Sequence, residues 1–406
     1  EMAGAHDGLV RSHRWAASHS ALATALSDPR SLGQIRDELE RAIMVDIGPV
    51  RVGPRSYVLP EESRVRGGEL LVFDVVLQNE RVGHRFPGGV RDIQDTWVEV
   101  EVRDATGRVI GVSRPTADSH EGVFVLRATM LDSDGDPELL HRVHRFAAPA
   151  FDRTLGAHEA RAVRYSLELP RRIVLPLEVH ARLLHRKHGP ELQAFACNAS
   201  QTERGRAFAE AAERWGKIAI DPCADQSVTT VGSATVWMGP GAKTRAAEGG
   251  ATRPSVERLL SQGLALLHGQ QEHVDLAKPS IERAQELARR AGSPRLQARA
   301  FVLRARLSAI QGRPERAVGF VKRAEALIGP SPVLDRVRGD AYARVWRWGP
   351  AVEAYRRIAD VAPLDYRAWR DLARAYGSLS DDRNALDAAD AGLALAPLDE
   401  SLLRSR

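Results

Sequence analysis

Residues 366–397 read YRAWRDLARAYGSLSDDRNALDAADAGLALAP, and this stretch decides the fold of the carboxy-terminal third of the chain. Its small, aromatic and proline positions recur one period earlier, at the 34-residue spacing of tetratricopeptide repeats. In such a repeat, small residues let two antiparallel helices approach closely, and a proline follows where the second helix stops. The matched pairs are Gly339 with Ala373, Tyr342 with Tyr376, Ala351 with Ala385, and Pro363 with Pro397.

The repeat pattern predicts a tetratricopeptide α-solenoid over residues 255–406, with a weaker first unit over residues 255–291. Stacked helix pairs leave a concave groove, which the first helix of each pair lines. An acidic partner segment could bind there, although a chain this rich in arginine also places some arginines there by chance. The candidate groove residues are Arg299, Arg306, Arg336, Arg367, Arg370 and Arg374.

Residues 46–190 have a different pattern, in which apolar and polar side chains alternate with a period of two. This alternation is typical of strands that bury one face, and turn residues separate the runs. We therefore expect an antiparallel β-sandwich over residues 46–190. The clearest runs are 70–77, 96–102, 109–112, 123–126, 162–169 and 177–184.

The remaining segments complete a multidomain α and β fold class. Residues 1–45 predict helices with a break at Asp28-Pro29. Residues 191–254 predict an irregular or helical linker, because residues 231–250 are rich in Gly, Ala and Thr. The expected order is N-terminal helices, an antiparallel β-sandwich, a linker and the C-terminal tetratricopeptide α-solenoid.

Charge and composition exclude several partners. The net charge is +5, but acids and bases are interspersed and no basic run carries aromatics, so we expect no nucleic-acid partner. No apolar run approaches the roughly 20 residues of a membrane span, and no signal peptide opens the sequence. The two cysteines, Cys197 and Cys223, form no metal or haem-attachment motif. They are compatible with one disulfide or with two thiols.

The stretch Asn79–Gly89 reads NERVGHRFPGG, and Asp92 and Trp97 follow it before an alternating strand. This resembles the β-domain after the haem-bearing part of certain bacterial multihaem c-type cytochromes. In that family an N-x-x-V-G-H-x-F-P-x-G stretch leads into a D-x-x-x-x-W-V-x-V-x-V strand, and a tetratricopeptide tail is common. The resemblance covers most of the chain in the same order. It extends to residues 12–15 with 20–22, Asp152, Pro170 and residues 181–187.

The chain departs from that family in carrying no Cys-x-x-Cys-His motif, which covalent c-type haem requires. Ser18-His19-Ser20 also replaces an expected asparagine and threonine. The resemblance thus implies a haem c on another segment or subunit, to which this chain supplies axial imidazoles, and a periplasmic or extracellular location. The axial-ligand candidates are His13 and His84, which are equally open to a purely structural role. The haem-packing candidates are Trp15, Phe86 and Pro87.

No motif for catalysis is visible, whether G-x-S-x-G, a P-loop or H-E-x-x-H. Residues 132–136 are a polar hairpin turn rather than a calcium loop, and His141-x-x-His144 lacks a third metal ligand. We therefore expect no enzyme. The favoured hypothesis is an accessory or C-terminal part of a multihaem cytochrome electron-transfer system that docks partners through its repeats. The alternative is a haem-free tetratricopeptide and β-sandwich adaptor or scaffold.

Overall fold

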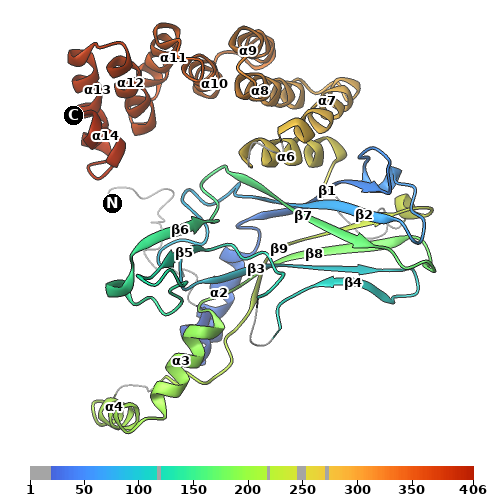
Figure 1. The fold of residues 1–406 in the computed structure, drawn as a ribbon, viewed down its shortest axis with the longest axis vertical. Helices are drawn as coiled ribbons and strands as arrows, with labels where there is room; N and C mark the ends of the chain where they lie inside the picture. The colour runs from blue at the N-terminus through green and yellow to red at the C-terminus, as the bar shows by residue number, and fades with distance from the viewer. Residues whose placement is uncertain (1–19, 117–119, 217–219, 245–252, 270–273) are drawn as a thin grey trace, which may run out of the picture. The chain divides into compact units, whose positions relative to one another are not determined.

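A computed structural model describes residues 20–116, 120–216, 220–244, 253–269 and 274–406. The chain divides into two compact units, residues 1–252 and residues 253–406. The first unit contains antiparallel sheets and four described helices, and the second consists of paired helices (Figure 1). The predicted fold class, antiparallel β structure followed by a tetratricopeptide-type helical array, is confirmed.

A three-stranded antiparallel sheet has the strand order β1-β2-β7. Its central strand β2 is the alternating run of the sequence, and Leu71, Phe73 and Val75 are at most 1% exposed. The edge strand β1 contains a register shift between Ile47 and Val50, where Gly48-Pro49 interrupts the ladder. The strands are β1 (Met44–Val52), β2 (Leu70–Gln78) and β7 (Ala160–Glu168).

A four-stranded antiparallel sheet has the order β4-β3-β8-β9. Its inward residues, such as Val98 and Leu183, belong to the same hydrophobic cluster as Phe73 of the first sheet. The two sheets therefore share one core, as the alternation predicts. The strands are β3 (Asp95–Arg103), β4 (Val109–Ser113), β8 (Leu177–Arg186) and β9 (Thr229–Met238).

Strand β9 corrects the expectation that residues 191–254 form a linker. It pairs with β8 from Thr229 to Met238. Close packing requires a glycine in this strand, because a Cβ on Gly232 would lie 2.5 Å from the carbonyl oxygen of Ile43. The strand expected at residues 123–126 is also wrong, since its single ladder contact is an isolated bridge between Val125 and Trp97.

A small hairpin projects from the first unit and is called the β5–β6 lobe, residues 128–152. It contains β5 (Ala128–Leu131), the 3₁₀ turn η2 (Val143–Arg145) and β6 (Ala148–Asp152). Every residue of β6 is exposed. The turn after β5 is the polar turn that the sequence predicts. The carboxylate of Asp132 accepts hydrogen bonds from the backbone N–H groups of Asp134 and Asp136, both at 3.0 Å.

Four described helices accompany the sheets. The side chain of Asp28 caps α2 by accepting a hydrogen bond from the Ser31 backbone at 3.0 Å, so the Asp-Pro break separates two helices as predicted. Cys197 in α3 forms a disulfide with Cys223, which settles the question that the sequence leaves open. The elements are α1 (Ser20–Ala25), α2 (Pro29–Leu39), η1 (Pro60–Glu62), α3 (Pro190–Ser200) and α4 (Glu203–Arg214).

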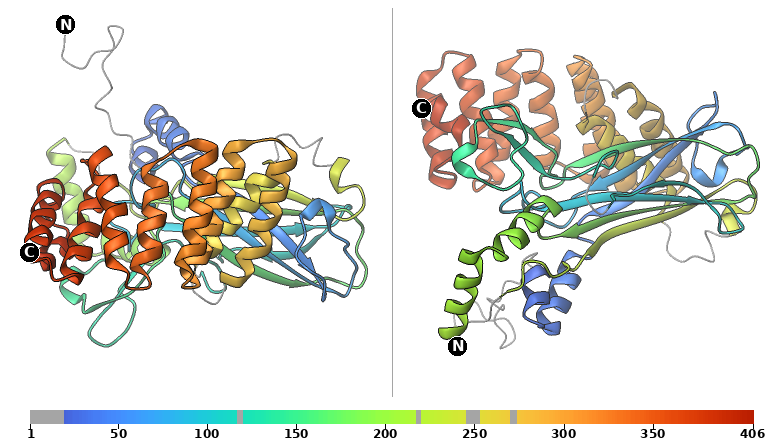
Figure 2. Two further views of the ribbon diagram at one scale, coloured as in Figure 1. Left: turned by 90° about the horizontal axis from the view of Figure 1, so that it is seen from above. Right: turned by 60° about the horizontal axis from the view of Figure 1, so that its bottom comes forward.

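The second unit is a row of antiparallel helices (Figure 2). Prolines open several of them at the first turn, where a missing N–H costs nothing. Ser293, Ser331 and Asp381 accept hydrogen bonds from the first-turn backbone of their helices. The helices are α6 (Ser255–His268), α7 (Val274–Arg290), α8 (Pro294–Ile310), α9 (Pro314–Ile328), α10 (Pro332–Ala343), α11 (Trp348–Val361), α12 (Tyr366–Ser378), α13 (Asp382–Leu395) and α14 (Glu400–Ser405).

Gly339 shows why small residues recur at the repeat period. A Cβ at Gly339 in α10 would lie 2.5 Å from Cε1 of Tyr355 in α11. The Tyr355 side chain is fully buried, and its hydroxyl donates to the Asp340 carboxylate at 2.8 Å. The aromatic ring of one helix therefore occupies the space that the glycine of its partner leaves open.

We predict that Gly339→Ala destabilises the repeat unit by about 1–3 kcal/mol, because the buried Tyr355 ring has to shift. The matched control is Gly377→Ala in α12, where no atom lies within 4 Å of the added Cβ. That change should leave stability unchanged or raise it by roughly 0.5–1 kcal/mol, since alanine favours a helix. Urea unfolding of the full chain, followed by circular dichroism, compares the two. Equal midpoints would contradict the packing argument.

Reduction of the Cys197–Cys223 disulfide should loosen the first unit locally. The bond closes a loop with a sequence separation of 26 residues, for which chain entropy gives a contribution of about 3–4 kcal/mol. We expect reductant to increase hydrogen exchange in α3 and residues 220–226 while the β2 amides stay protected. The Cys197→Ser/Cys223→Ser variant should show the same pattern without reductant. Unchanged exchange in both would show that the disulfide does not restrain these segments.

Candidate functional site

Asn79, the first residue after β2, fixes the loop that follows, called the His84 loop, residues 79–92. Its side chain is completely buried. The amide nitrogen donates hydrogen bonds to the carbonyls of His84 at 2.9 Å and Leu155 at 3.2 Å, and the amide oxygen accepts one from the Val82 backbone at 3.0 Å. One side chain thus hydrogen-bonds to three backbone groups, of which the Leu155 carbonyl also accepts from the Phe86 N–H.

The His84 side chain is exposed, and its Nδ1 lies 2.7 Å from the backbone carbonyl oxygen of Arg85. A carbonyl can only accept a hydrogen bond, so Nδ1 carries the proton and the lone pair of the neutral ring is on Nε2. Among the described residues, none hydrogen-bonds to Nε2. Gly88 packs against the ring, since a Cβ there would lie 2.9 Å from Cε1 of His84. The loop therefore fixes the imidazole while its Nε2 has no hydrogen-bond partner among the described residues.

Phe86 and Pro87 lie inside the protein, at the base of the His84 loop. Phe86 is 5% exposed and belongs to the hydrophobic core, and Pro87 is buried. The backbone of Phe86 exchanges two hydrogen bonds with Leu155, at 2.8 and 2.9 Å, which draws the side chain inward. These residues anchor the loop, and their packing against a haem stays a prediction.

A basic cluster adjoins the His84 loop. Arg91 pairs with Asp152 at 2.5 Å, and Arg85 lies 3.9 Å from Asp152 and 3.8 Å from Glu159. Burial opposes ionisation of Asp152, but hydrogen bonds from Thr154 and the charges of Arg91 and Arg85 outweigh it and lower the pKa of that carboxyl. Nearby, burial and the charge of Arg153 lower the pKa of the Arg161 guanidinium. Arginines outnumber carboxylates in this cluster, so the surface beside His84 is positive.

The β5–β6 lobe contacts the His84 loop through side chains and through a backbone hydrogen bond from Ala128 N–H to the Arg91 carbonyl at 3.3 Å. Besides the pairing of Arg91 with Asp152, Asp92 accepts a hydrogen bond from Nδ1 of His141 at 2.7 Å. Sequence reasoning assigned His141 no role beyond its spacing to His144. The missed signal is the proximity of Asp92, which only the folded chain reveals.

Three other histidines are buried or half-buried in the fold, and two predicted site residues lie outside the described ranges. His185 is fully buried with Nδ1 2.7 Å from the Thr96 hydroxyl, and His120 is largely buried with Nε2 3.1 Å from Asp95. Burial lowers the pKa of the half-buried His180. His13 and Trp15 lie outside the described residues. Within the described ranges, no three or more His, Cys, Asp or Glu side chains form a group suited to a metal ion.

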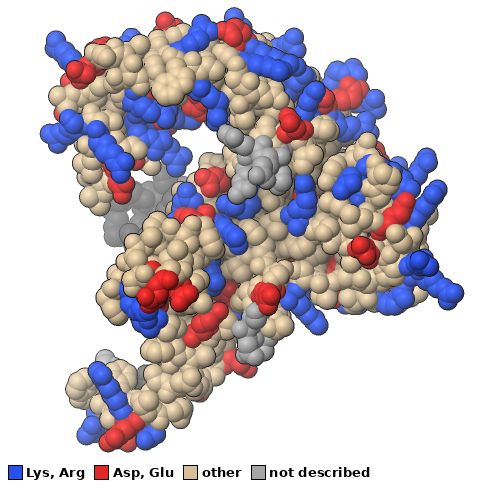
Figure 3. All heavy atoms as spheres, in the orientation of Figure 1, with Lys and Arg blue, Asp and Glu red and all other residues tan. Residues whose placement is uncertain are grey.

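The candidate groove arginines are partly neutralised by neighbouring acids. Arg336 pairs with Asp365 at 2.9 Å and also with Asp371, which lies 3.8 Å from Arg374. Figure 3 shows acidic side chains among the basic ones over the visible face. An acidic partner segment in this groove stays a prediction. Of the others, Arg370 lies 3.8 Å from Asp399, Arg306 is half-buried with a pKa lowered by burial, Arg299 is half-buried and Arg367 is exposed.

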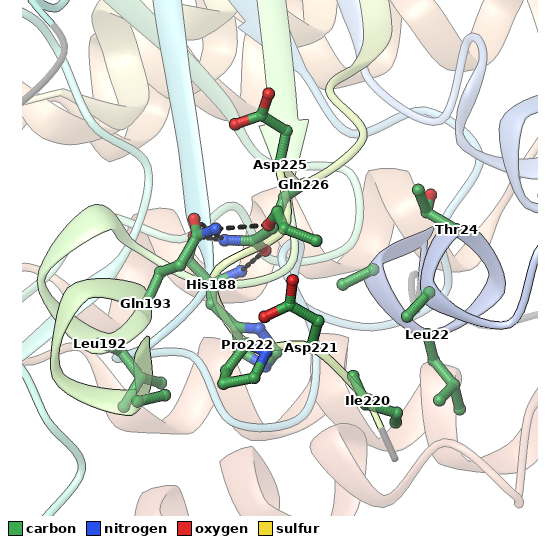
Figure 4. Close-up of a pocket in the computed structure, with 14 residues that line it drawn as sticks. Leu22, Thr24, His188, Leu192, Gln193, Ile220, Asp221, Pro222, Asp225 and Gln226 are labelled. Carbon is green, nitrogen blue, oxygen red and sulfur yellow. Dashed lines mark hydrogen bonds between the residues drawn. The ribbon is translucent and has the colours of Figure 1, made fainter. Parts of the chain in front are cut away.

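A largely apolar cavity of about 570 Å³ lies between α1, α3 and residues 220–226 (Figure 4). Gln226 forms one wall by accepting from the His188 backbone N–H at 2.9 Å and donating to the His188 carbonyl at 3.1 Å. The disulfide joins α3 to the same wall through Cys223. The cavity is thus braced by one covalent bond and by a side-chain amide.

In the part of the chain that the structure describes, no helix has the length and apolar character that crossing a bilayer requires. The sequence matches no protein-family model and no curated protein.

Solved structures show a weak likeness. A penta-heme cytochrome c552 from Thermochromatium tepidum has a TM-score of 0.31 and 16% identity, covering 50% of this chain and 41% of that protein's length. The TPR domain of Arabidopsis OM64 has a TM-score of 0.26 and 15% identity, covering 28% of this chain and 93% of its own. MamA AMB-1 has a TM-score of 0.30 and 16% identity, covering 37% of this chain and 76% of its own. The match spans less than half of the length of the cytochrome.

Proposed function

We propose that this protein is an accessory or C-terminal part of a multihaem c-type cytochrome system and supplies His84 as an axial ligand to a haem held by another segment or subunit. The observation that carries the proposal is an exposed imidazole whose Nδ1–H is fixed 2.7 Å from a backbone carbonyl. Metal-bound histidines characteristically donate their other ring N–H in this way, which fixes the tautomer and the ring plane.

The surroundings of His84 fit such a ligand in two further respects. A single imidazole suits a metal that arrives with its other ligands, as haem iron does. The arginine-rich cluster around Asp152 complements the propionate carboxylates of a haem. When bound, the haem supplies one-electron transfer, while the residues of this chain orient the imidazole and balance charge.

The disulfide and the repeats support the rest of the proposal. Disulfides persist in oxidising compartments, which agrees with a periplasmic or extracellular location. The helical repeats offer a groove for a protein partner. Electron transfer needs positioned cofactors rather than an acid–base pair, so the proposed role is not that of an enzyme.

The test uses a haem c undecapeptide whose own histidine provides the fifth ligand and whose sixth position is open. The full-length protein is titrated into this probe, and the conversion of the Soret spectrum to the low-spin form is followed. We expect His84→Ala to lose one equivalent of low-spin complex, because the Nε2 lone pair is gone. The matched control is His144→Ala, an exposed histidine with no side-chain hydrogen bond among the described residues, which should bind as the unaltered protein does.

Identical titrations of the unaltered protein and His84→Ala would exclude the ligand role. A chain that formed no low-spin complex at all would then be better described as a haem-free adaptor, with its sheets and repeats as two binding modules.

A further inference from the structure

His141 lies in the β5–β6 lobe, and its imidazole is held from two sides. Its Nδ1 is 2.7 Å from Oδ2 of Asp92, whose side chain is only 10% exposed. The Phe146 ring contacts the imidazole edge to face, with the ring centroids 5.7 Å apart. The His141 side chain is nevertheless 37% exposed. The imidazole is therefore fixed in orientation and open to a ligand.

The backbone of His141 has a φ of +56°, a conformation that few residues other than glycine adopt. Holding the backbone there costs free energy that the surrounding contacts must offset. The hydrogen bond to Asp92 and the contact with Phe146 are the described interactions that hold the ring in place. A strained backbone that carries a fixed and exposed imidazole indicates a role beyond packing.

The chemistry of the contact identifies the kind of ligand. A carboxylate accepts a hydrogen bond only, so Nδ1 carries the proton and Nε2 of the neutral ring has the lone pair. No described residue hydrogen-bonds to Nε2. The arrangement carboxylate–imidazole–open Nε2 is the usual second-shell support of a metal-bound histidine. Among the described residues, no three or more His, Cys, Asp or Glu side chains form a group that could hold a metal ion. A metal bound by His141 would therefore take its other ligands from elsewhere, as haem iron does.

We infer that His141 is a second axial ligand, binding through Nε2 the iron of another haem carried by the same partner, and that Asp92 is its positioning residue. This inference rests on the proposed function of His84. Asp92 orients the ring and strengthens its electron donation to the metal, because it draws on the Nδ1 proton. The His84 loop and the β5–β6 lobe, joined by this contact, then form one surface that presents two imidazoles.

The experiment again titrates the full-length protein into the haem c undecapeptide and counts low-spin equivalents. The variant is His141→Asn, because asparagine tolerates a positive φ and preserves the fold of the turn. His144→Asn, three residues along the same turn, is the matched control. We expect His141→Asn to lose one equivalent and His144→Asn to lose none. The His84→Ala/His141→Asn double variant should lose two.

Asp92→Asn tests the positioning role separately. It keeps the imidazole but weakens the acceptor, so we expect about 10- to 100-fold weaker binding at one of the two sites and a higher reduction potential of the haem peptide bound there. The site that remains in His141→Asn should not respond to Asp92→Asn. Unchanged affinity and potential in Asp92→Asn would overturn the role of Asp92.

The outcomes separate this inference from the proposed function. If His141→Asn binds as many equivalents as the unaltered protein while His84→Ala loses one, the assignment of His141 is wrong and the role of His84 stands. If neither variant loses an equivalent, both are wrong. Circular dichroism and thermal unfolding of His141→Asn confirm that a lost equivalent reflects the ligand rather than the fold.

Discussion

The buried amide of Asn79 is the interaction on which the geometry of the proposed ligand surface depends. Three backbone groups have Asn79 as a partner: the carbonyls of His84 and Leu155 and the N–H of Val82. An unsatisfied buried polar group costs about 1–3 kcal/mol, so no apolar side chain of similar size could replace the amide without loosening the loop. Because the amide holds the carbonyl of His84, it also sets the place from which that side chain leaves the loop.

Much of the architecture was predictable because its signals are periodic. The 34-residue recurrence of small and aromatic residues specified the helical array, and Gly339 against Tyr355 gives the physical reason for it. Alternation specified β2, β3, β7 and β8. Strand β9 was missed because Gly232 and its small neighbours, which close packing requires, imitate a linker in composition.

The candidate site was predictable only in part, because its components are tertiary. The motif around His84 identified one imidazole, but the burial of Phe86 followed from its backbone pairing with Leu155, which no local pattern reveals. The contact between Asp92 and His141 joins residues 49 positions apart. Likewise, the presence of two cysteines in a sequence does not show whether they form a disulfide, because the bond requires the fold to bring them close together.

The two imidazoles differ in the group that accepts their Nδ1 proton. His84 donates to the carbonyl of its own neighbour, whereas His141 donates to a carboxylate on another segment. A carboxylate is the stronger acceptor, so His141 is the more electron-rich donor. Two haems bound by these residues would therefore differ in potential even with the same ligand type.

One proline lies in the edge strand β1, where it is buried, and another lies in the exposed strand β6. Pro49 lies at the irregularity of the edge strand β1, and Pro149 lies in β6, every residue of which is exposed. Each removes a backbone donor from a strand that would otherwise offer an open ladder, and the irregularity in β1 bends that edge further. The two prolines thereby oppose growth of the sheets by strand addition between neighbouring copies of the protein.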